Sequence, residues 1–227
     1  LRGFEIRGSG IEPDLDHSGV TITGVNTTVE NNRLRDVLFG IFVSQAGQSV
    51  VRGNDIGGKV SLDEGRRGDA IRLWYSPDVL VEDNVVHASR DTVIGYSQRC
   101  TVRGNRIENG RYGIHLMYTD GVDIERNILR GNAVGIYVMY STGVTMIGND
   151  IRGHRGPSGY ALGFKDADRV RVEENLLIDN RTAVFSEGTP FQPGGFARFE
   201  KNVFAFNEQG VVVAPSPAMI GETLAKH

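Results

Sequence analysis

Apolar and polar residues alternate in short runs along most of the chain. Pairs of apolar residues spaced two apart include Ile71/Leu73, Ile114/Leu116 and Ile136/Val138, with polar or small residues between them. A spacing of two is typical of strands that bury one face. No segment carries a sustained helical period. The pattern predicts an all-β protein built from short strands.

The runs belong to a repeated unit. Residues 113–119, GIHLMYT, return as residues 135–141, GIYVMYS, a shift of 22. One asparagine marks the same place in each unit, at intervals of 22, 30, 21, 22, 22, 26 and 27 residues. A base period of 22 with insertions accounts for all of these intervals. The marker residues are Asn32, Asn54, Asn84, Asn105, Asn127, Asn149, Asn175 and Asn202.

A unit of this length with two or three short strands predicts a right-handed parallel β-helix, a solenoid of about nine coils. Leucine-rich repeats have a comparable length but need a leucine consensus that this chain lacks. Successive coils are expected about 4.8 Å apart, the spacing of paired strands. We predict a structural role for the marker asparagines, because an amide at one bend of every coil can bond the coils above and below.

We expect one domain over residues 1–214, with residues 1–28 as an irregular first coil and residues 215–227 as a tail. The chain starts in mid-pattern without a signal peptide, so we interpret it as a fragment of a longer protein. Two of its three insertions follow a marker asparagine, so we expect them at one edge; tolerated insertions and binding loops both fit them. The insertions are Gly57–Gly68, Gly153–Gly159 and Glu187–Gly195.

Composition narrows the classes of function. The formal net charge of −3 does not suggest a nucleic-acid binder. No apolar run approaches the roughly 18 residues that a membrane span needs. Cys100 is the one cysteine, so no internal disulfide can form, and its strand position predicts a buried thiol.

The two central coils carry an unusual set of outward residues. Alternation in residues 114–118 points Ile114, Leu116 and Tyr118 inward. His115 and Met117 then face outward, and Tyr137 and Met139 should lie beside them in the next coil.

Thioether sulfur and imidazole form a soft ligand set that suits Cu(I). We therefore predict that His115, Met117 and Met139 form a copper site. The alternative is that the methionines pack beneath a partner or beneath a missing segment of chain. No cysteine or histidine spacing typical of a tight structural metal site occurs.

Catalysis is not the favoured interpretation. The carboxylates fall mostly in predicted turns at different phases of the repeat, so no convergent pair is expected. The alternative function is a lyase or epimerase acting on an acidic polysaccharide, with a groove near Arg72, His115 and Tyr137. A purely structural stalk is a third possibility.

The chain resembles the NosD family from about residue 30 to residue 213. Four stretches carry the resemblance. They are GRYGIHLMYTD (110–120), GNAVGIYVMYS (131–141), GHRGPSGYALGFKDAD (153–168) and NVFAFNEQGVVV (202–213). NosD proteins are exported β-helix proteins that assist copper-site assembly in nitrous-oxide reductase, an enzyme of denitrification. The resemblance implies a periplasmic, non-catalytic protein that works with an ABC transporter, a copper chaperone and the reductase.

The resemblance supplies no ligand set, and either copper or sulfur fits as the cargo. We place the partner contacts on exposed residues near the copper residues and on the 153–168 stretch. These predicted partner-binding residues are Trp74, Tyr137, Arg155, Tyr160, Lys165 and Asp166.

Overall fold

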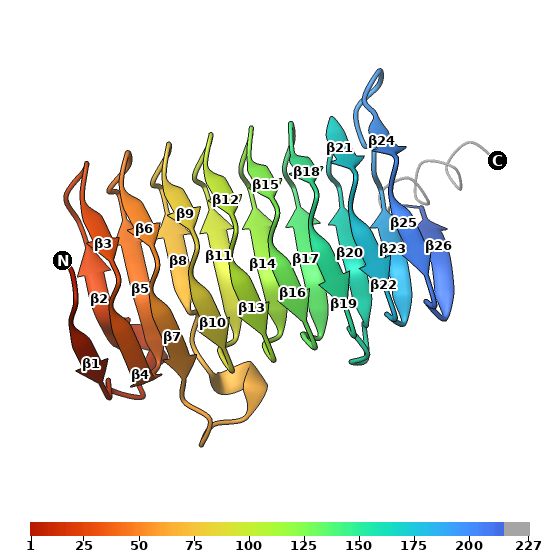
Figure 1. The fold of residues 1–227 in the computed structure, drawn as a ribbon. Helices are drawn as coiled ribbons and strands as arrows, with labels where there is room; N and C mark the ends of the chain where they lie inside the picture. Colours follow the sequence, from red (N-terminus) through yellow and green to blue (C-terminus); the bar gives the residue numbers. More distant parts are fainter. Residues whose placement is uncertain (216–227) are drawn as a thin grey trace.

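Each full coil contributes three short strands, and like strands of successive coils pair in parallel (Figure 1). The computed structural model describes residues 1–215. Within them the strands form a right-handed parallel β-helix with sheets of nine, nine and eight strands, as the repeat predicted. Residues 216–227, most of the predicted tail, lie outside the described part of the chain.

The first sheet contains β1 (Glu5–Arg7), β4 (Arg33–Val37), β7 (Asp55–Gly58), β10 (Val85–His87), β13 (Arg106–Glu108), β16 (Ile128–Arg130), β19 (Asp150–Arg152), β22 (Leu176–Ile178) and β25 (Val203–Ala205). The second sheet contains β2 (Ser18–Ile22), β5 (Phe39–Ser44), β8 (Ile71–Trp74), β11 (Asp91–Gly95), β14 (Tyr112–Met117), β17 (Val134–Met139), β20 (Tyr160–Lys165), β23 (Thr182–Glu187) and β26 (Gln209–Ala214).

The third sheet contains β3 (Thr28–Glu30), β6 (Val50–Arg52), β9 (Leu80–Glu82), β12 (Thr101–Arg103), β15 (Asp123–Glu125), β18 (Thr145–Ile147), β21 (Val170–Glu173) and β24 (Ala197–Glu200). Two short 3₁₀ helices, η1 (Pro13–Leu15) and η2 (Glu64–Arg66), lie in connections from the first sheet to the second. The insertions 57–68 and 153–159 both occupy this type of connection, so the prediction of a common edge is confirmed.

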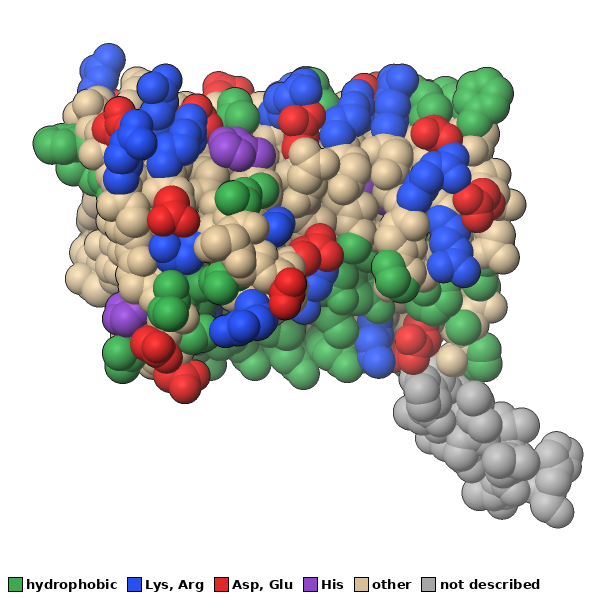
Figure 2. Space-filling view, turned by 90° about the horizontal axis from the view of Figure 1, so that it is seen from below, with side chains coloured by type: hydrophobic (Ala, Val, Ile, Leu, Met, Phe, Trp, Pro, Cys, Tyr) green, Lys and Arg blue, Asp and Glu red, His purple; other side chains and the backbone are tan. Residues whose placement is uncertain are grey.

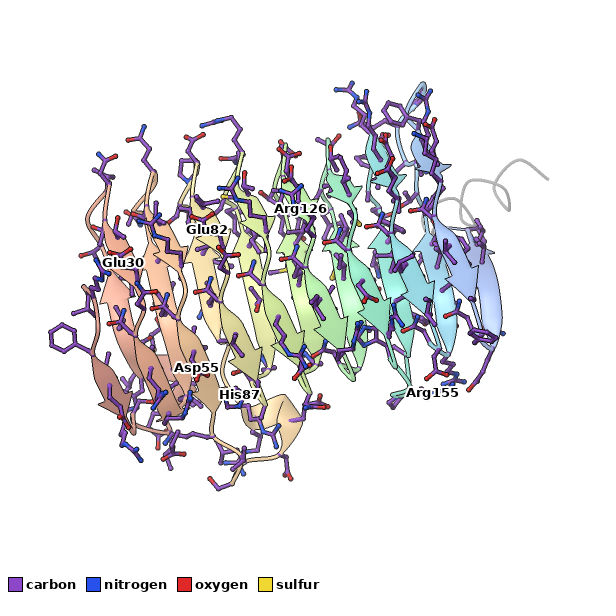
Figure 3. The ribbon with its side chains drawn as sticks, viewed as in Figure 1. Glu30, Asp55, Glu82, His87, Arg126 and Arg155 are labelled. Carbon is purple, nitrogen blue, oxygen red and sulfur yellow. The ribbon has the colours of Figure 1, made fainter. Side chains whose placement is uncertain are left out.

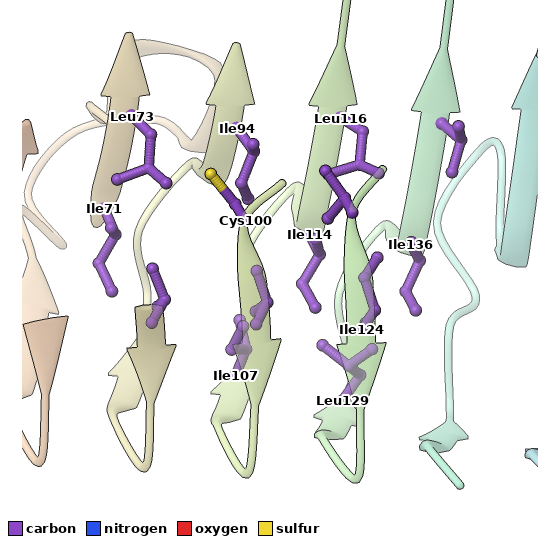
Figure 4. Packing of buried hydrophobic residues seen from close by; sticks show 14 of the residues in the cluster. Ile71, Leu73, Ile94, Cys100, Ile107, Ile114, Leu116, Ile124, Leu129 and Ile136 are labelled. Atoms are coloured by element: carbon purple, nitrogen blue, oxygen red, sulfur yellow. The ribbon is translucent and has the colours of Figure 1, made fainter. Parts of the chain in front are cut away.

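The core fills the space between the three sheets with stacked apolar rows (Figure 4). Leu73, Ile94 and Leu116 form one such row, each fully buried and each paired with its neighbour one coil away. Burying a side chain of this size stabilises a fold by about 1.5–3 kcal/mol. Cys100 lies in the same core, and burial raises the pKa of its thiol to about 11. The thiol is therefore a packing group, as its strand position indicated.

The marker asparagines form a continuous ladder along one corner, and all of them except Asn202 are buried. In a typical step, the backbone N–H and Nδ2 of Asn127 both donate to Oδ1 of Asn149, at 3.0 Å each. Nδ2 of Asn127 also donates to the Val102 carbonyl at 2.9 Å. Each amide therefore ties together neighbouring coils at a bend where strand pairing is interrupted.

A second ladder runs five residues further along the chain, and the sequence interpretation missed it. Asn132, Asn180 and Asn207 occupy one row, with His154 taking the place of the asparagine in one coil. Nδ1 of His154 lies 2.9 Å from the Asn132 carbonyl, and the ring is completely buried. The fixed offset of five residues from the marker asparagines was the available signal.

Tyr118 does not face inward, so that prediction is wrong. Strand β14 ends at Met117, and Tyr118 adopts a left-handed backbone with φ of 53°. The change of direction breaks the alternation, and the side chain is 45% exposed.

Candidate copper site on the second sheet

The outer face of the second sheet carries the predicted metal residues in two rows. Strands β14 and β17 pair in the register that the repeat predicted, with His115 beside Tyr137 and Met117 beside Met139. His115 is nonetheless only 8% exposed, because neighbouring side chains pack over it. The edge of its ring meets Tyr112, with the ring centroids 5.0 Å apart.

His115 and Met139 are in direct contact. The Nε2 atom of His115 lies 3.3 Å from the Sδ atom of Met139. Met117 is the strand neighbour of Met139 and occupies the same outward row. An imidazole nitrogen and two thioethers thus share a small area of the surface, which is the donor set that Cu(I) prefers.

The other side of the His115 ring faces a buried carboxylate. Nδ1 lies 3.5 Å from Oδ2 of Asp91, whose side chain is 1% exposed. Arg111 donates to the same carboxylate with Nε at 2.9 Å and with a second guanidinium nitrogen. A carboxylate behind a histidine, on the side away from its free nitrogen, commonly orients a metal-binding imidazole.

A shift in the register between β11 and β14 brings Asp91 close to His115. Asp91 pairs with Tyr112 at an offset of 21 residues, whereas Val93 pairs with His115 at an offset of 22. The extra residue in β14 is accommodated as a bulge, which re-aims side chains locally.

Asp91 and His115 line a hollow of about 200 Å³ in this face, and a second buried carboxylate, Asp69, lines it too. Asp69 accepts a hydrogen bond from Nε of Arg90 at 3.0 Å. Burial raises the pKa of Asp69 to about 6, against the opposing effect of Arg90. Burial also acts to raise the pKa of Asp91, but interactions with His115 and Arg111 outweigh it and hold that pKa below its ordinary value.

The expectation that no carboxylates converge is therefore wrong. Asp69 lies two residues before β8, and Asp91 is the first residue of β11, the next strand of the same sheet. Their common place at the start of consecutive second-sheet strands was the signal that could have found them. Arg72 lines the same hollow, with its guanidinium carbon 5.0 Å from the centroids of both Phe42 and Trp74.

An aromatic ladder, which the sequence interpretation missed, borders the methionines. Its members are Tyr75, Tyr96, Tyr118 and Tyr140, with neighbouring ring centroids 4.8, 5.1 and 4.9 Å apart and nearly parallel planes. All four tyrosines have φ near +50°, a backbone conformation that costs a bulky residue energy. Stacking offsets part of that cost. Trp74 meets the first two rings of the ladder edge-on.

The predicted partner-binding residues divide between two places. Trp74, Tyr137 and Lys165 lie on the outward face with His115, and Lys165 pairs with Glu187 at 3.7 Å. Burial raises the pKa of Tyr137 to about 12.

Tyr160 begins β20 and stacks on Phe185 at 4.5 Å, and Asp166 follows β20 directly at the bend. Arg155 lies apart, in the loop between β19 and β20 (Figure 3). There it pairs with Glu208 at 2.7 Å and with Asp179.

The donor chemistry decides which metal fits. Across residues 1–215, no three histidine, cysteine or carboxylate side chains gather as a metal-binding group. A hard or borderline ion would need such a group, whereas a soft Cu(I) ion can use thioethers with one imidazole. His115, Met117 and Met139 fit Cu(I) on these grounds.

No helix in residues 1–215 is long and apolar enough to cross a membrane. Solved structures with the same fold include the periplasmic alginate epimerase AlgG, with a TM-score of 0.59 and 14% identity over 83% of this chain. The mannuronan C-5 epimerase AlgE4 A-module of Azotobacter vinelandii has a TM-score of 0.54 and 14% identity, again over 83%. This chain covers 50% and 64% of those two chains, respectively, and at such identity the likeness shows the fold alone.

A family model gives the more specific result. The model described as "Periplasmic copper-binding protein (NosD)" matches residues 57–218, which is well over half of the chain and includes every candidate copper residue. The chain therefore belongs to the NosD family of periplasmic copper-binding proteins.

Proposed function

We propose that this chain binds Cu(I) on the outer face of the second sheet and acts as a non-catalytic accessory protein in copper-site assembly of nitrous-oxide reductase. The observation that carries the proposal is the 3.3 Å contact between His115 Nε2 and Met139 Sδ, with Met117 alongside. Membership of a periplasmic copper-binding family supports the choice of metal and compartment.

Each residue has a distinct role in this proposal. His115 supplies an imidazole nitrogen, and Met139 and Met117 supply thioether sulfur. Asp91 faces the imidazole from behind, where it would orient the ring, and is itself bonded by Arg111. The ABC transporter, the copper chaperone and the reductase would dock near Trp74, Tyr137 and Lys165, which border the copper residues.

A competition titration with Cu(I) tests the metal part of the proposal. We expect about one equivalent to bind, and the double variant Met117→Leu/Met139→Leu to bind far more weakly. Met146→Leu is the matched control, because Met146 is fully buried in the core and distant from the outer face. Equal Cu(I) binding by the double variant and the wild type would show that Met117 and Met139 are not copper ligands.

The copper content of nitrous-oxide reductase tests the cellular role. Cells that lack this protein should produce a copper-deficient reductase, and the wild type should restore the copper where the double variant does not. If the double variant fully restored the copper content of the reductase, maturation would not depend on copper binding at this site.

One observation favours a second candidate, an epimerase or lyase acting on uronate polymers. Asp69, Asp91 and His115 line one hollow together with Arg72 and Arg111. Such a set offers a base for a carbon-bound proton and cations for a substrate carboxylate. Activity on polyuronates that is lost in His115→Ala and kept in Met139→Leu would support the enzyme and contradict the copper role.

A further inference from the structure

A second hollow, of about 280 Å³, lies at the corner between the first and second sheets and is called the corner pocket below. The loop that contains η1 forms one wall, and the insertion 57–68 that contains η2 forms the other. Leu38 and Phe39 form its floor and are 1% and 4% exposed. This volume is just below the range of about 300–1,000 Å³ that is typical of small-molecule sites.

The insertion is fixed to the coil, so the pocket has a stable wall. A Cβ atom on Gly68 would lie 2.2 Å from the Leu38 carbonyl oxygen, so only glycine permits this approach. The backbone N–H of Arg90 donates to the Gly68 carbonyl at 2.9 Å. Inside the insertion, Nε of Arg67 donates to the Leu62 carbonyl at 2.9 Å.

Two guanidinium groups in the pocket wall lack an acidic partner. Neither Arg66 nor Arg67 has a carboxylate oxygen within 4.0 Å among the described residues. A guanidinium offers five N–H donors, and the one side-chain bond recorded for this pair is that of Arg67 to Leu62. Arg90 also lines the pocket, but Asp69 already accepts from it.

Glu12 on the opposite wall carries the one acidic side chain of the lining. Figure 2 shows this side of the molecule, where blue basic side chains lie beside green hydrophobic ones. The pocket therefore combines an apolar floor with two free cations and one opposing anion.

We infer that the corner pocket binds a small organic anion, a carboxylate or phosphate monoester attached to an apolar group. The anionic group would pair with Arg66 and Arg67, as planar guanidinium groups do with carboxylates and phosphates. The apolar group would lie on Leu38 and Phe39. The inference is independent of the proposed copper function, because Arg66, Arg67, Leu38 and Phe39 do not line the copper-site hollow.

Calorimetric titration with phenyl phosphate and with benzoate tests the inference. Both should bind, while inorganic phosphate, which lacks the apolar group, and benzyl alcohol, which lacks the charge, should bind at least about tenfold more weakly. Inorganic phosphate binding as tightly as phenyl phosphate would contradict a role for the apolar floor. Absence of binding by both probes at millimolar concentration would overturn the inference.

Charge variants give the sharper test. Arg66→Gln should weaken binding of phenyl phosphate about tenfold, and it breaks no side-chain hydrogen bond or ion pair within residues 1–215. Glu12→Gln should strengthen binding, because it removes the opposing charge. Arg126→Gln, on a distant corner (Figure 3), and Met117→Leu/Met139→Leu should leave binding unchanged. Equal affinity in the wild type, Arg66→Gln and Glu12→Gln would rule out the corner pocket as the site.

Discussion

The ring of Tyr137 lies against the backbone of Gly163 in the next coil. A Cβ atom on Gly163 would be 2.4 Å from Cδ2 of Tyr137, closer than real Cβ contacts come. Trp74 covers Gly95 in the same way, with a distance of 2.6 Å to Cζ3. Because neither glycine has a Cβ atom, a large aromatic ring can lie flat on the sheet at each position, beside the copper site.

Replacing Gly163 by alanine should displace the ring of Tyr137. We expect a loss of about 1–3 kcal/mol in the free energy of unfolding, as for other overpacked positions, measured by urea denaturation. Gly210→Ala is the control, because a Cβ there meets open space. Equal stability of the two variants would show that the ring moves aside without cost.

Removing an amide from the middle of the asparagine ladder should cost more than removing one at its end. Asn127→Ala leaves the backbone N–H of Asn105 without its acceptor and the Val102 carbonyl without its side-chain donor, in a fully buried setting. We expect a loss of about 2–4 kcal/mol from these unsatisfied groups. Asn202→Ala, at the partly exposed last step, should lose less. Denaturant unfolding of both variants measures the difference, and a larger loss at Asn202 would contradict this account.

The buried ring of His154 should make stability depend on pH. Burial lowers its pKa to about 4 in the folded chain, whereas an unperturbed histidine titrates near 6.5. The unfolded chain therefore takes up the proton first as the pH falls. Stability is fully present above about pH 6.5 and is lost toward pH 4, by up to about 3 kcal/mol.

His154→Asn supplies the test, because asparagine occupies the same row at Asn132 and Asn180. Unfolding free energies of the wild type and the variant should diverge between pH 7 and pH 4.5, with the wild type losing more. Parallel pH profiles of the two proteins would show that a group other than His154 makes the unfolding free energy depend on pH.

The two methionines of the copper site should contribute unequally to the affinity for Cu(I). Sδ of Met139 contacts Nε2 of His115, whereas Met117 lies beside Met139 on the neighbouring strand. Met139→Leu should therefore weaken Cu(I) binding more than Met117→Leu, while both keep the volume of the side chain. Affinities from a Cu(I) competition assay give the ratio. A larger effect at Met117 would reverse the assignment of the principal thioether.

Periodicity predicted the features that repeat at fixed spacing. The 22-residue interval placed Met117 beside Met139 and gave the inward rows, because strand pairing between coils preserves phase. Comparing where carboxylates lie relative to the second strand of each unit would also have found the buried Asp69 and Asp91, which come just before β8 and at the start of β11.

Features set by corners were not predictable in this way. Tyr118 was misplaced because its left-handed backbone ends the alternation one residue after Met117. The contact of His115 with Asp91 depends on a bulge that shifts the register by one residue. The corner pocket joins segments about 50 residues apart, 11–13 and 62–68, and only the folded chain shows that they face each other.

The side chains on the outer face of the second sheet change in character along the solenoid axis. One row reads Trp74, Gly95, Met117, Met139, Lys165 and Glu187, and the row beside it reads Tyr75, Tyr96, Tyr118, Tyr140 and Asp166. Both rows change from aromatic and sulfur-bearing side chains to charged ones at the same step, from β17 to β20. A molecule lying across that boundary would find two unlike halves and would have one preferred orientation along the axis.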